Sequence, residues 1–173
     1  MTNTSAGTVA KLMRLAKVIV NDEEPFLKSL KKYGAKAAAA NAVSATQNRR
    51  FGDHSFEIGN VRWSTEMCGV GEGRTNFSLG LSKLKNYVGF DGNPEHAFYI
   101  FWCYDAESDN KSDRIYFAVN AQKLKEKTSS FKLIDNKWFL ISPQEMAKEG
   151  LPVVGATNSD ELARLLVEYL ETL

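Results

Sequence analysis

Residues that hold small domains together covalently or bind transition metals are scarce in this sequence. Among 173 residues there are two cysteines, two histidines and no C-x-x-C pair. A tetrahedral zinc site would need Cys68, Cys103, His54 and His96 all to converge, so two reduced thiols are the simpler interpretation. No apolar run approaches the ~20 residues of a membrane helix, and residues 1–7 lack the features of a signal peptide. These absences predict a soluble, cytoplasmic protein without disulfides.

Motifs of several familiar catalytic classes are missing as well. There is no G-x-S-x-G, so the sequence offers no nucleophile elbow. The glycine-rich run at residues 69–74 has neither the Lys-Ser/Thr pair of a P-loop nor the spacing of a dinucleotide motif, and Glu72 stands in its middle. We therefore interpret this run as a hairpin turn and not as a phosphate-binding loop.

Basic residues are unevenly distributed along the chain. The net charge is only +1, yet residues 1–50 contain nine lysines and arginines against three acidic residues. Such a local excess is the electrostatic signature of a surface for an anionic partner, and nucleic acid is the first candidate. The alternative is that the basic residues of the first helix form the solvated face of an ordinary amphipathic helix. The candidate nucleic-acid-binding residues are Lys11, Arg14, Lys17, Arg49 and Arg50.

Hydrophobic periodicity predicts a helical N-terminal segment over residues 1–48. Apolar residues at helical spacing indicate a helix over 8–20, and Asn21-Asp22 is expected to end it. Pro25 suits the start of a second helix and Gly34 its end. The alanine-rich stretch 36–45 is predicted to be a third helix.

Residues 49–173 have the pattern of an α+β core. The run 97–104 is apolar on both faces, as in a central strand covered on both sides, and 115–119 is predicted to pair with it as a hairpin. Asn158 and Glu161 have the spacing of a capping box before an amphipathic C-terminal helix. The predicted fold is therefore α+β, with a mixed sheet of four to six strands flanked by helices, forming one compact domain with the N-terminal segment.

The order of elements resembles a known nuclease family. A helical region is followed by extended chain over 51–65, by the polar stretch 76–84, by the apolar strand through Trp102 and by the hairpin ending at 119. Over about residues 51–127 this order resembles the restriction-endonuclease-like (PD-D/E-x-K) superfamily. In that family an acid and an acid-x-lysine pair on adjacent strands hold magnesium and activate water. The resemblance implies Asp53 as the first acid and as a metal ligand.

The same resemblance places the second motif on Asn60-Val61-Arg62. Asn60 replaces the acid and Arg62 the lysine, and arginine does not give up its proton. Glu57 is the acid that would substitute as the second metal ligand. The candidate catalytic residues are accordingly Asp53, Glu57 and Arg62.

Two functions remain open from the sequence. One is a nucleic-acid-associated protein with a restriction-endonuclease-like, catalytically degenerate core; if it is an enzyme, it is a magnesium-dependent nuclease acting on DNA or RNA. The alternative is a non-enzymatic protein-interaction module of phage, plasmid or defence-system type, with a protein as its partner. Convergence of Asp53, Glu57 and Arg62 on one sheet edge would favour the nuclease.

The basic N-terminal residues can be tested directly. Replacing Lys11, Arg14 and Lys17 together by glutamine should weaken nucleic-acid binding without unfolding the protein. Each lost phosphate contact should also reduce the slope of log affinity against log salt by roughly 0.9 for duplex DNA. Fluorescence anisotropy over a salt series measures both quantities. Equal affinity for the parent and the triple variant would assign these side chains to a solvated helix face.

Overall fold

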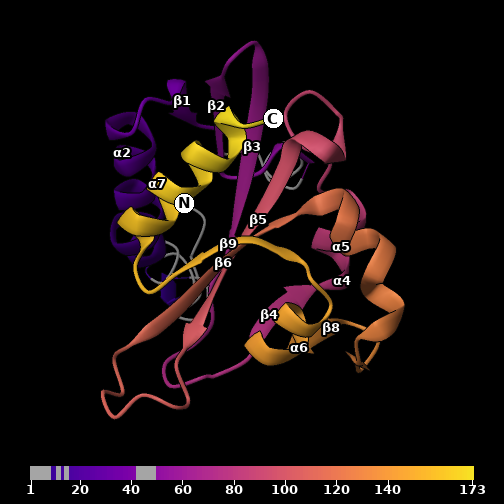
Figure 1. Cartoon of the computed structure of the whole chain (residues 1–173). Helices are drawn as coiled ribbons and strands as arrows, with labels where there is room; N and C mark the ends of the chain where they lie inside the picture. Colours follow the sequence, from indigo (N-terminus) through magenta and orange to yellow (C-terminus); the bar gives the residue numbers. More distant parts are fainter. Residues whose placement is uncertain (1–8, 11–12, 14–15, 42–49) are drawn as a thin grey trace, which may run out of the picture.

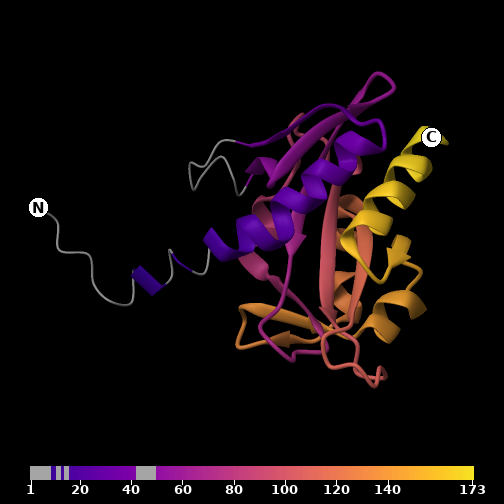
Figure 2. The same cartoon turned by 90° about the vertical axis from the view of Figure 1, so that its left-hand side faces the viewer.

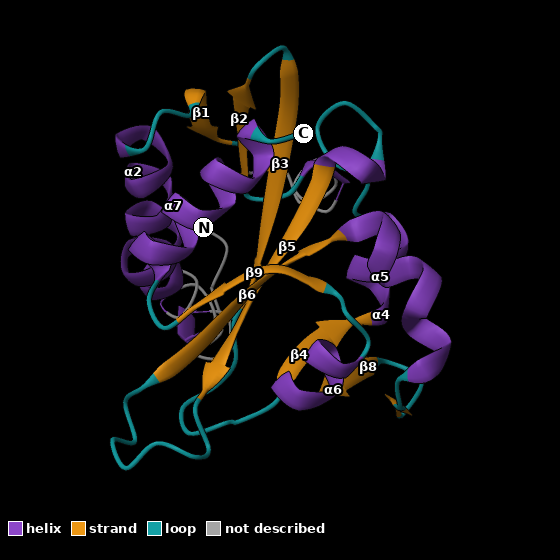
Figure 3. Cartoon of the chain, viewed as in Figure 1, coloured by secondary structure: helices purple, strands orange, loops and turns teal. Residues whose placement is uncertain are grey.

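The computed structural model describes residues 9–10, 13, 16–41 and 50–173. A six-stranded mixed sheet lies at the centre, and helices cover both of its faces (Figure 1). A second, three-stranded sheet lies beside one end of it (Figure 3). None of the helices in the described residues combines the length and the apolar character that crossing a membrane requires.

The elements follow one another with short connections. The helical elements are η1 (Ile19–Glu23), α2 (Glu24–Lys32), α4 (Leu81–Asn86), η2 (Pro94–His96), α5 (Ala121–Lys127), η3 (Thr128–Ser130), α6 (Pro143–Lys148) and α7 (Ser159–Glu171). The strands are β1 (Lys36–Ala40), β2 (His54–Ile58), β3 (Val61–Cys68), β4 (Phe77–Gly80), β5 (Ala97–Tyr104), β6 (Arg114–Asn120), β7 (Leu133–Ile134), β8 (Trp138–Ile141) and β9 (Pro152–Ala156).

The central sheet has the strand order β1-β2-β3-β5-β6-β9. Strands β3 and β5 are parallel, whereas every other neighbouring pair is antiparallel. The predicted α+β class, the mixed sheet and the hairpin of β5 with β6 are confirmed. Strand β5 is buried along almost its whole length, because apolar side chains on both of its faces meet a separate core.

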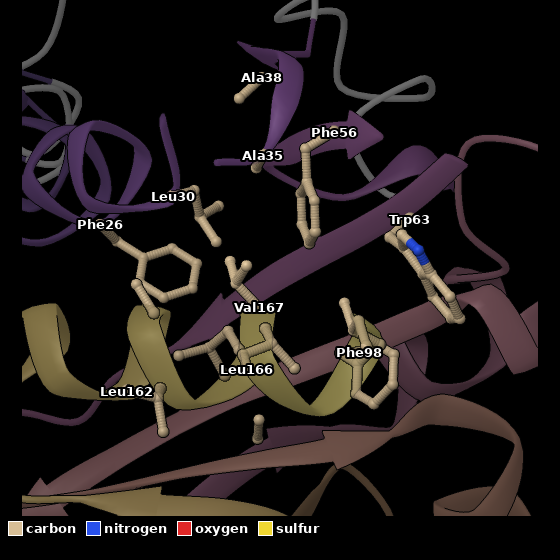
Figure 4. Packing of buried hydrophobic residues seen from close by; sticks show 14 of the residues in the cluster. Phe26, Leu30, Ala35, Ala38, Phe56, Trp63, Phe98, Leu162, Leu166 and Val167 are labelled. Carbon is tan, nitrogen blue, oxygen red and sulfur yellow. The ribbon is translucent and has the colours of Figure 1, made fainter. Parts of the chain in front are cut away.

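One face of the sheet packs against α2 and α7. These helices lie side by side, joined by hydrogen bonds from Ser29 and Tyr33 to Asp160 (Figure 2). Figure 4 shows Leu166 of α7 among the buried side chains that this face contributes. The other face is covered by α4, α5, α6 and the small sheet, so an apolar core forms on each side.

The prediction of a helix over residues 36–45 is wrong for its described part. Residues 36–40 form β1, which pairs antiparallel with β2 at the edge of the central sheet. Alanine favours a helix by well under 1 kcal/mol per residue, and the backbone hydrogen bonds offered by β2 override that preference. Ala38 alone in β1 is buried, so the strand contributes little side-chain packing.

Asn21-Asp22 does not end the first helix as the sequence suggested. Residues 16–18 are helical, η1 widens into a π-helical turn, and α2 follows without a gap. A π-turn inserts one extra residue per turn and so rotates the side chains that follow. The start of α2 near Pro25 and its end before Gly34, which has φ 105°, agree with the sequence.

Leu166 provides a direct test of the role of α7. It is fully buried, whereas Leu173 just beyond the same helix is 71% exposed. Replacing a buried leucine by alanine removes apolar contacts and leaves a cavity, so Leu166→Ala should lower the free energy of unfolding by about 2–5 kcal/mol. Chemical denaturation measures this quantity, with Leu173→Ala as the matched control. Similar unfolding of the two variants would mean that α7 is peripheral.

Candidate functional site

The site begins where β3 extends beyond the end of β2. The two strands form a hairpin about Gly59 and Asn60, and its last paired residues are His54 and Thr65. Beyond that pair, Met67 is left without a strand neighbour on this side, and Asp53 fills the place. The Met67 amide donates to the Asp53 carboxylate over 2.7 Å, and the Asp53 amide donates to the Thr65 carbonyl over 2.8 Å.

Gly52 makes this approach possible. Its φ is 86°, and a Cβ atom there would lie 2.7 Å from the Thr65 carbonyl oxygen and 2.8 Å from the Tyr87 ring. A side chain at this position would push the strand away from β3. The sequence Gly52-Asp53 therefore places a carboxylate at the edge of β3 that β2 leaves unpaired.

Glu66 lies on β3 beside Asp53 and is only 7% exposed. The hairpin register places residues 53 and 66 opposite each other, one step beyond the pair His54 and Thr65. One Glu66 oxygen, Oε1, lies 2.8 Å from the Lys83 ammonium of α4. The other, Oε2, is buried and has no hydrogen-bond partner among the described residues. A buried carboxylate oxygen without a partner is costly, and it marks a place where a ligand or an ion can be bound.

Glu23 reaches the same edge from the other face of the sheet. It is the last residue of η1, and its carboxyl group shares a hydrogen bond with Asp53. Its neighbour Asp22 is turned toward β6, where it accepts a hydrogen bond of 2.9 Å from Arg114. The Arg114 guanidinium also stacks 3.8 Å from the Trp102 ring centroid. This anchor holds the π-turn, and the π-turn directs Glu23 toward Asp53.

Burial raises the pKa values of all three carboxyl groups, and the charge of Asp53 adds to the shift at Glu66 and at Glu23. The pKa of Glu66 rises to about 8, first through burial and then through the charge of Asp53. The pKa of Glu23 rises to about 7 for the same two reasons. Burial also raises the pKa of Asp53, although the Met67 amide partly opposes the shift. At neutral pH the cluster therefore retains protons that a bound cation would displace.

Lys83 remains protonated in this setting. Burial alone would lower the pKa of its ammonium group, yet the acidic groups around it hold the pKa above the usual lysine value. Its Nζ also lies 3.9 Å from the sulfur of Cys68, two residues beyond Glu66 on β3. Burial raises the pKa of that thiol to about 12, so Cys68 is neutral and is not a nucleophile.

The donor set suits a hard divalent cation. Carboxylate oxygens are the ligands that Mg²⁺ prefers, and it is usually held by one or two of them, with water and substrate phosphate completing the octahedron. As the side chains stand, no three Asp, Glu, His or Cys residues in the described part of the chain are grouped as a ready ligand set. Asp53 and Glu66, with its unpartnered Oε2, are thus the two residues that would hold the ion.

The sequence-predicted residues do not all converge. Asp53 is in the cluster, but Glu57 lies at the far end of β2, four residues and roughly 13 Å along the strand. Arg62 is the cross-strand partner of Glu57; it donates a 3.3 Å hydrogen bond to Ser55 and stacks 3.7 Å from the Phe90 ring centroid. Neither side chain reaches Asp53, because they share the turn end of the β2–β3 hairpin.

The basic residues predicted to bind nucleic acid are only partly described. Lys11, Arg14 and Arg49 lie outside the described residues. Lys17 and Arg50 are both exposed, which is compatible with binding but does not test it.

Sequence reasoning missed Glu66, Lys83 and Glu23. A signal for Glu66 was present: treating Gly59-Asn60 as a two-residue hairpin turn places residue 66 opposite residue 53. Lys83 carries no such signal, because it arrives from a helix that follows an excursion into the second sheet.

Comparisons with known proteins add no assignment. No family model, curated protein or solved structure matches the chain. The chemical interpretation of the site consequently depends on the geometry of Asp53, Glu66 and Lys83.

The carboxyl cluster predicts a pH-dependent stability. Because the pKa of Glu23 is raised to about 7 in the folded state, its contribution to stability is lost as the pH rises from about 4.5 through 7. Glu23→Gln keeps a hydrogen-bond donor for Asp53 at every pH. In the presence of EDTA the variant should therefore melt at a higher temperature than the parent at pH 8, with little difference at pH 5.

Glu24→Gln is the matched control, since Glu24 is exposed at the next position. Its melting temperature relative to the parent should change little between the two pH values. A Glu23→Gln effect that is the same at pH 5 and pH 8 would contradict the shared proton.

Proposed function

We propose that this protein is a metal-dependent nuclease whose centre is formed by Asp53, Glu66 and Lys83, with Glu23 beside them. The observation that carries the proposal is the pair of carboxyl groups of half-buried Asp53 and buried Glu66, at the edge of β3 that β2 leaves unpaired. One of them is paired with an ammonium group at 2.8 Å, and it keeps a second oxygen, Oε2, without a partner.

The resemblance seen in the sequence also supports this centre, provided that the second motif is placed on Glu66 and Cys68 and not on Asn60 and Arg62. The family has an acid on one strand and an acid-x-lysine pair on the next, followed by a helix and a buried strand. Asp53 and Glu66 lie on neighbouring strands, with α4 and β5 following. Cys68 stands where the lysine of the pair would be, and Lys83 brings its ammonium group to within 3.9 Å of the Cys68 sulfur. With Asp53, Glu66 and Lys83, the centre has all the charged groups that the family uses. We therefore propose an active nuclease in place of the catalytically degenerate core that the sequence suggested.

A magnesium or manganese ion held by Asp53 and Glu66 would activate water and offset the charge of a phosphodiester. The protein's own groups have separate tasks. Glu66 and Asp53 would give up their protons to supply carboxylate oxygens to the ion, and the Met67 amide fixes the orientation of the Asp53 carboxylate. Glu23 lies beside Asp53, and the charge of Asp53 adds to the burial that raises the pKa of Glu23.

Lys83 supplies positive charge at the same place. Its side chain is 36% exposed while Glu66 is almost fully buried, so the ammonium group connects the cluster with the surface. Because its pKa is raised, it stays charged and acts by orienting a phosphate oxygen or donating a hydrogen bond to it, and not as a base.

A purely structural or protein-binding role explains the cluster less well. Placing several ionisable groups in an interior costs free energy, and a hydrophobic set of similar volume is often equally or more stable. A protein-interaction module has no use for that cost. Clustered carboxyl groups with raised pKa values beside a charged lysine are a feature of functional sites.

Cleavage assays test the proposal. The protein should cut DNA or RNA in the presence of Mg²⁺ or Mn²⁺, and EDTA should stop the reaction. Asp53→Asn and Glu66→Gln should each lower the rate by about 100-fold or more, the scale of losing one group that stabilises charge at a reaction centre. Glu57→Gln is the matched control, because Glu57 lies on the same hairpin at the opposite end.

Thermal unfolding in the same samples separates loss of activity from loss of structure. Mg²⁺ or Mn²⁺ should raise the melting temperature of the parent and of Glu57→Gln, but not of Asp53→Asn. Cleavage that persists in both site variants would place the reaction elsewhere. A parent protein with neither cleavage nor metal-dependent stabilisation would refute the proposal.

A further inference from the structure

A cavity lies between the chain that follows β3 and the small sheet. It has a volume of about 510 Å³, within the range of roughly 300–1,000 Å³ that is typical of ligand sites. One wall is the glycine-rich segment 69–76, and the other is the outer face of β4, β7 and β8. In Figure 1 this small sheet lies below α4, the helix that carries Lys83.

The cavity and the cluster share the same two stretches of chain. Gly69 lines the cavity and is the first residue after β3, three positions beyond Glu66. On the other wall, Trp138 pairs with Gly80 across the small sheet. Gly80 directly precedes α4, the helix that contains Lys83. Both walls of the cavity therefore lie within a few residues of the Glu66–Lys83 pair along the chain.

Trp138 is the notable side chain of this cavity. It is 52% exposed, whereas Trp63 and Trp102 are each 5% exposed. A Cβ atom on Gly80 would meet the Trp138 ring at 3.3 Å, so the absence of a side chain at Gly80 makes room for the indole, which lines the cavity. Such an exposed indole offers a platform on which a planar group can stack.

The charge of the lining suits an anion. Among the described residues that line the cavity, Arg74 is the one charged side chain, and none is a carboxylate. Thr75, Asn76 and Ser78 add hydrogen-bonding groups. The nearest acids in the flanking turns, Glu72 and Asp135, are exposed and do not line it.

We propose that this cavity binds an unpaired base of a single-stranded nucleic acid, with the base stacked on Trp138 and its phosphate on Arg74. The inference rests on the proposed nuclease function and names its substrate class. In a duplex the faces of the bases are already stacked and cannot reach the indole. In a single strand they are free, and aromatic platforms beside basic side chains bind such strands with little sequence preference.

Intrinsic fluorescence tests the stacking, because Trp138 is the exposed member of three tryptophans. A dT or rU oligonucleotide should quench the emission of the full-length protein in EDTA, and a hairpin duplex of equal charge should quench it much less. Trp138→Ala should weaken single-strand binding roughly 5- to 100-fold, the effect of losing one base–aromatic stack. Trp138→Phe should restore most of the affinity for single strands. If Trp138 were merely structural, its loss would affect single-strand and duplex binding alike.

Arg74→Gln tests the phosphate contact. It should reduce the salt slope for single strands by about 0.7. Arg164→Gln is the control, since Arg164 lies on α7 on the opposite face of the central sheet. Unchanged single-strand affinity in Trp138→Ala, or an equal loss for duplex and single strand, would overturn the inference.

The outcomes separate the two proposals. Metal-dependent cleavage that is lost in Asp53→Asn but proceeds unchanged in Trp138→Ala would keep the nuclease and remove the stacking subsite. Binding of single strands that depends on Trp138, without cleavage under any metal, would keep the subsite and remove the nuclease.

Discussion

The ion pair between Glu66 and Lys83 joins the two halves of the molecule. Glu66 belongs to the central sheet, and Lys83 to a helix that directly follows β4 of the small sheet. A carboxylate as deeply buried as Glu66 is tolerated in a folded protein only beside a compensating charge or with a proton bound. The position of α4 is therefore constrained by Glu66, and with α4 come the small sheet and the cavity beneath Trp138.

The same constraint has an energetic consequence. Burial raises the pKa values of Glu23, Asp53 and Glu66, and the charge of Asp53 raises those of Glu23 and Glu66 further, so the cluster opposes folding at neutral and higher pH. The fold can bear this because the central sheet is buried by apolar cores on both faces. Functional sites often contain destabilising polar groups whose cost is offset by the rest of the fold. A bound cation would reduce this cost by replacing the protons of the carboxyl groups.

Two adjacent acidic residues in η1 have different roles in positioning the cluster. Asp22 is tied to Arg114, which stacks on Trp102, while Glu23 turns to Asp53. A regular α-helix would separate neighbouring side chains by about 100° around its axis. Within the π-turn, Asp22 anchors the helix to β6 and the next residue, Glu23, faces the site. At Asn21-Asp22, where the sequence suggested a break, the helix continues as a π-turn that contains the anchor residue Asp22.

The sequence by itself determined the elements whose signals are local. The apolar run of β5 and the Asn158 cap of α7 were both readable, since periodicity and caps act within a few positions. The resemblance also singled out Asp53, which lies in the carboxyl cluster of the structure.

Only the tertiary structure decided which residues join Asp53. The partnership with Glu66 depends on hairpin register, where a shift of a single residue turns a side chain to the other face of the sheet. Lys83 depends on how α4 packs after the chain has visited a second sheet, and β1 depends on the hydrogen bonds that β2 offers. These choices are made by contacts between segments distant in sequence, and the residues involved carry no local pattern that records them.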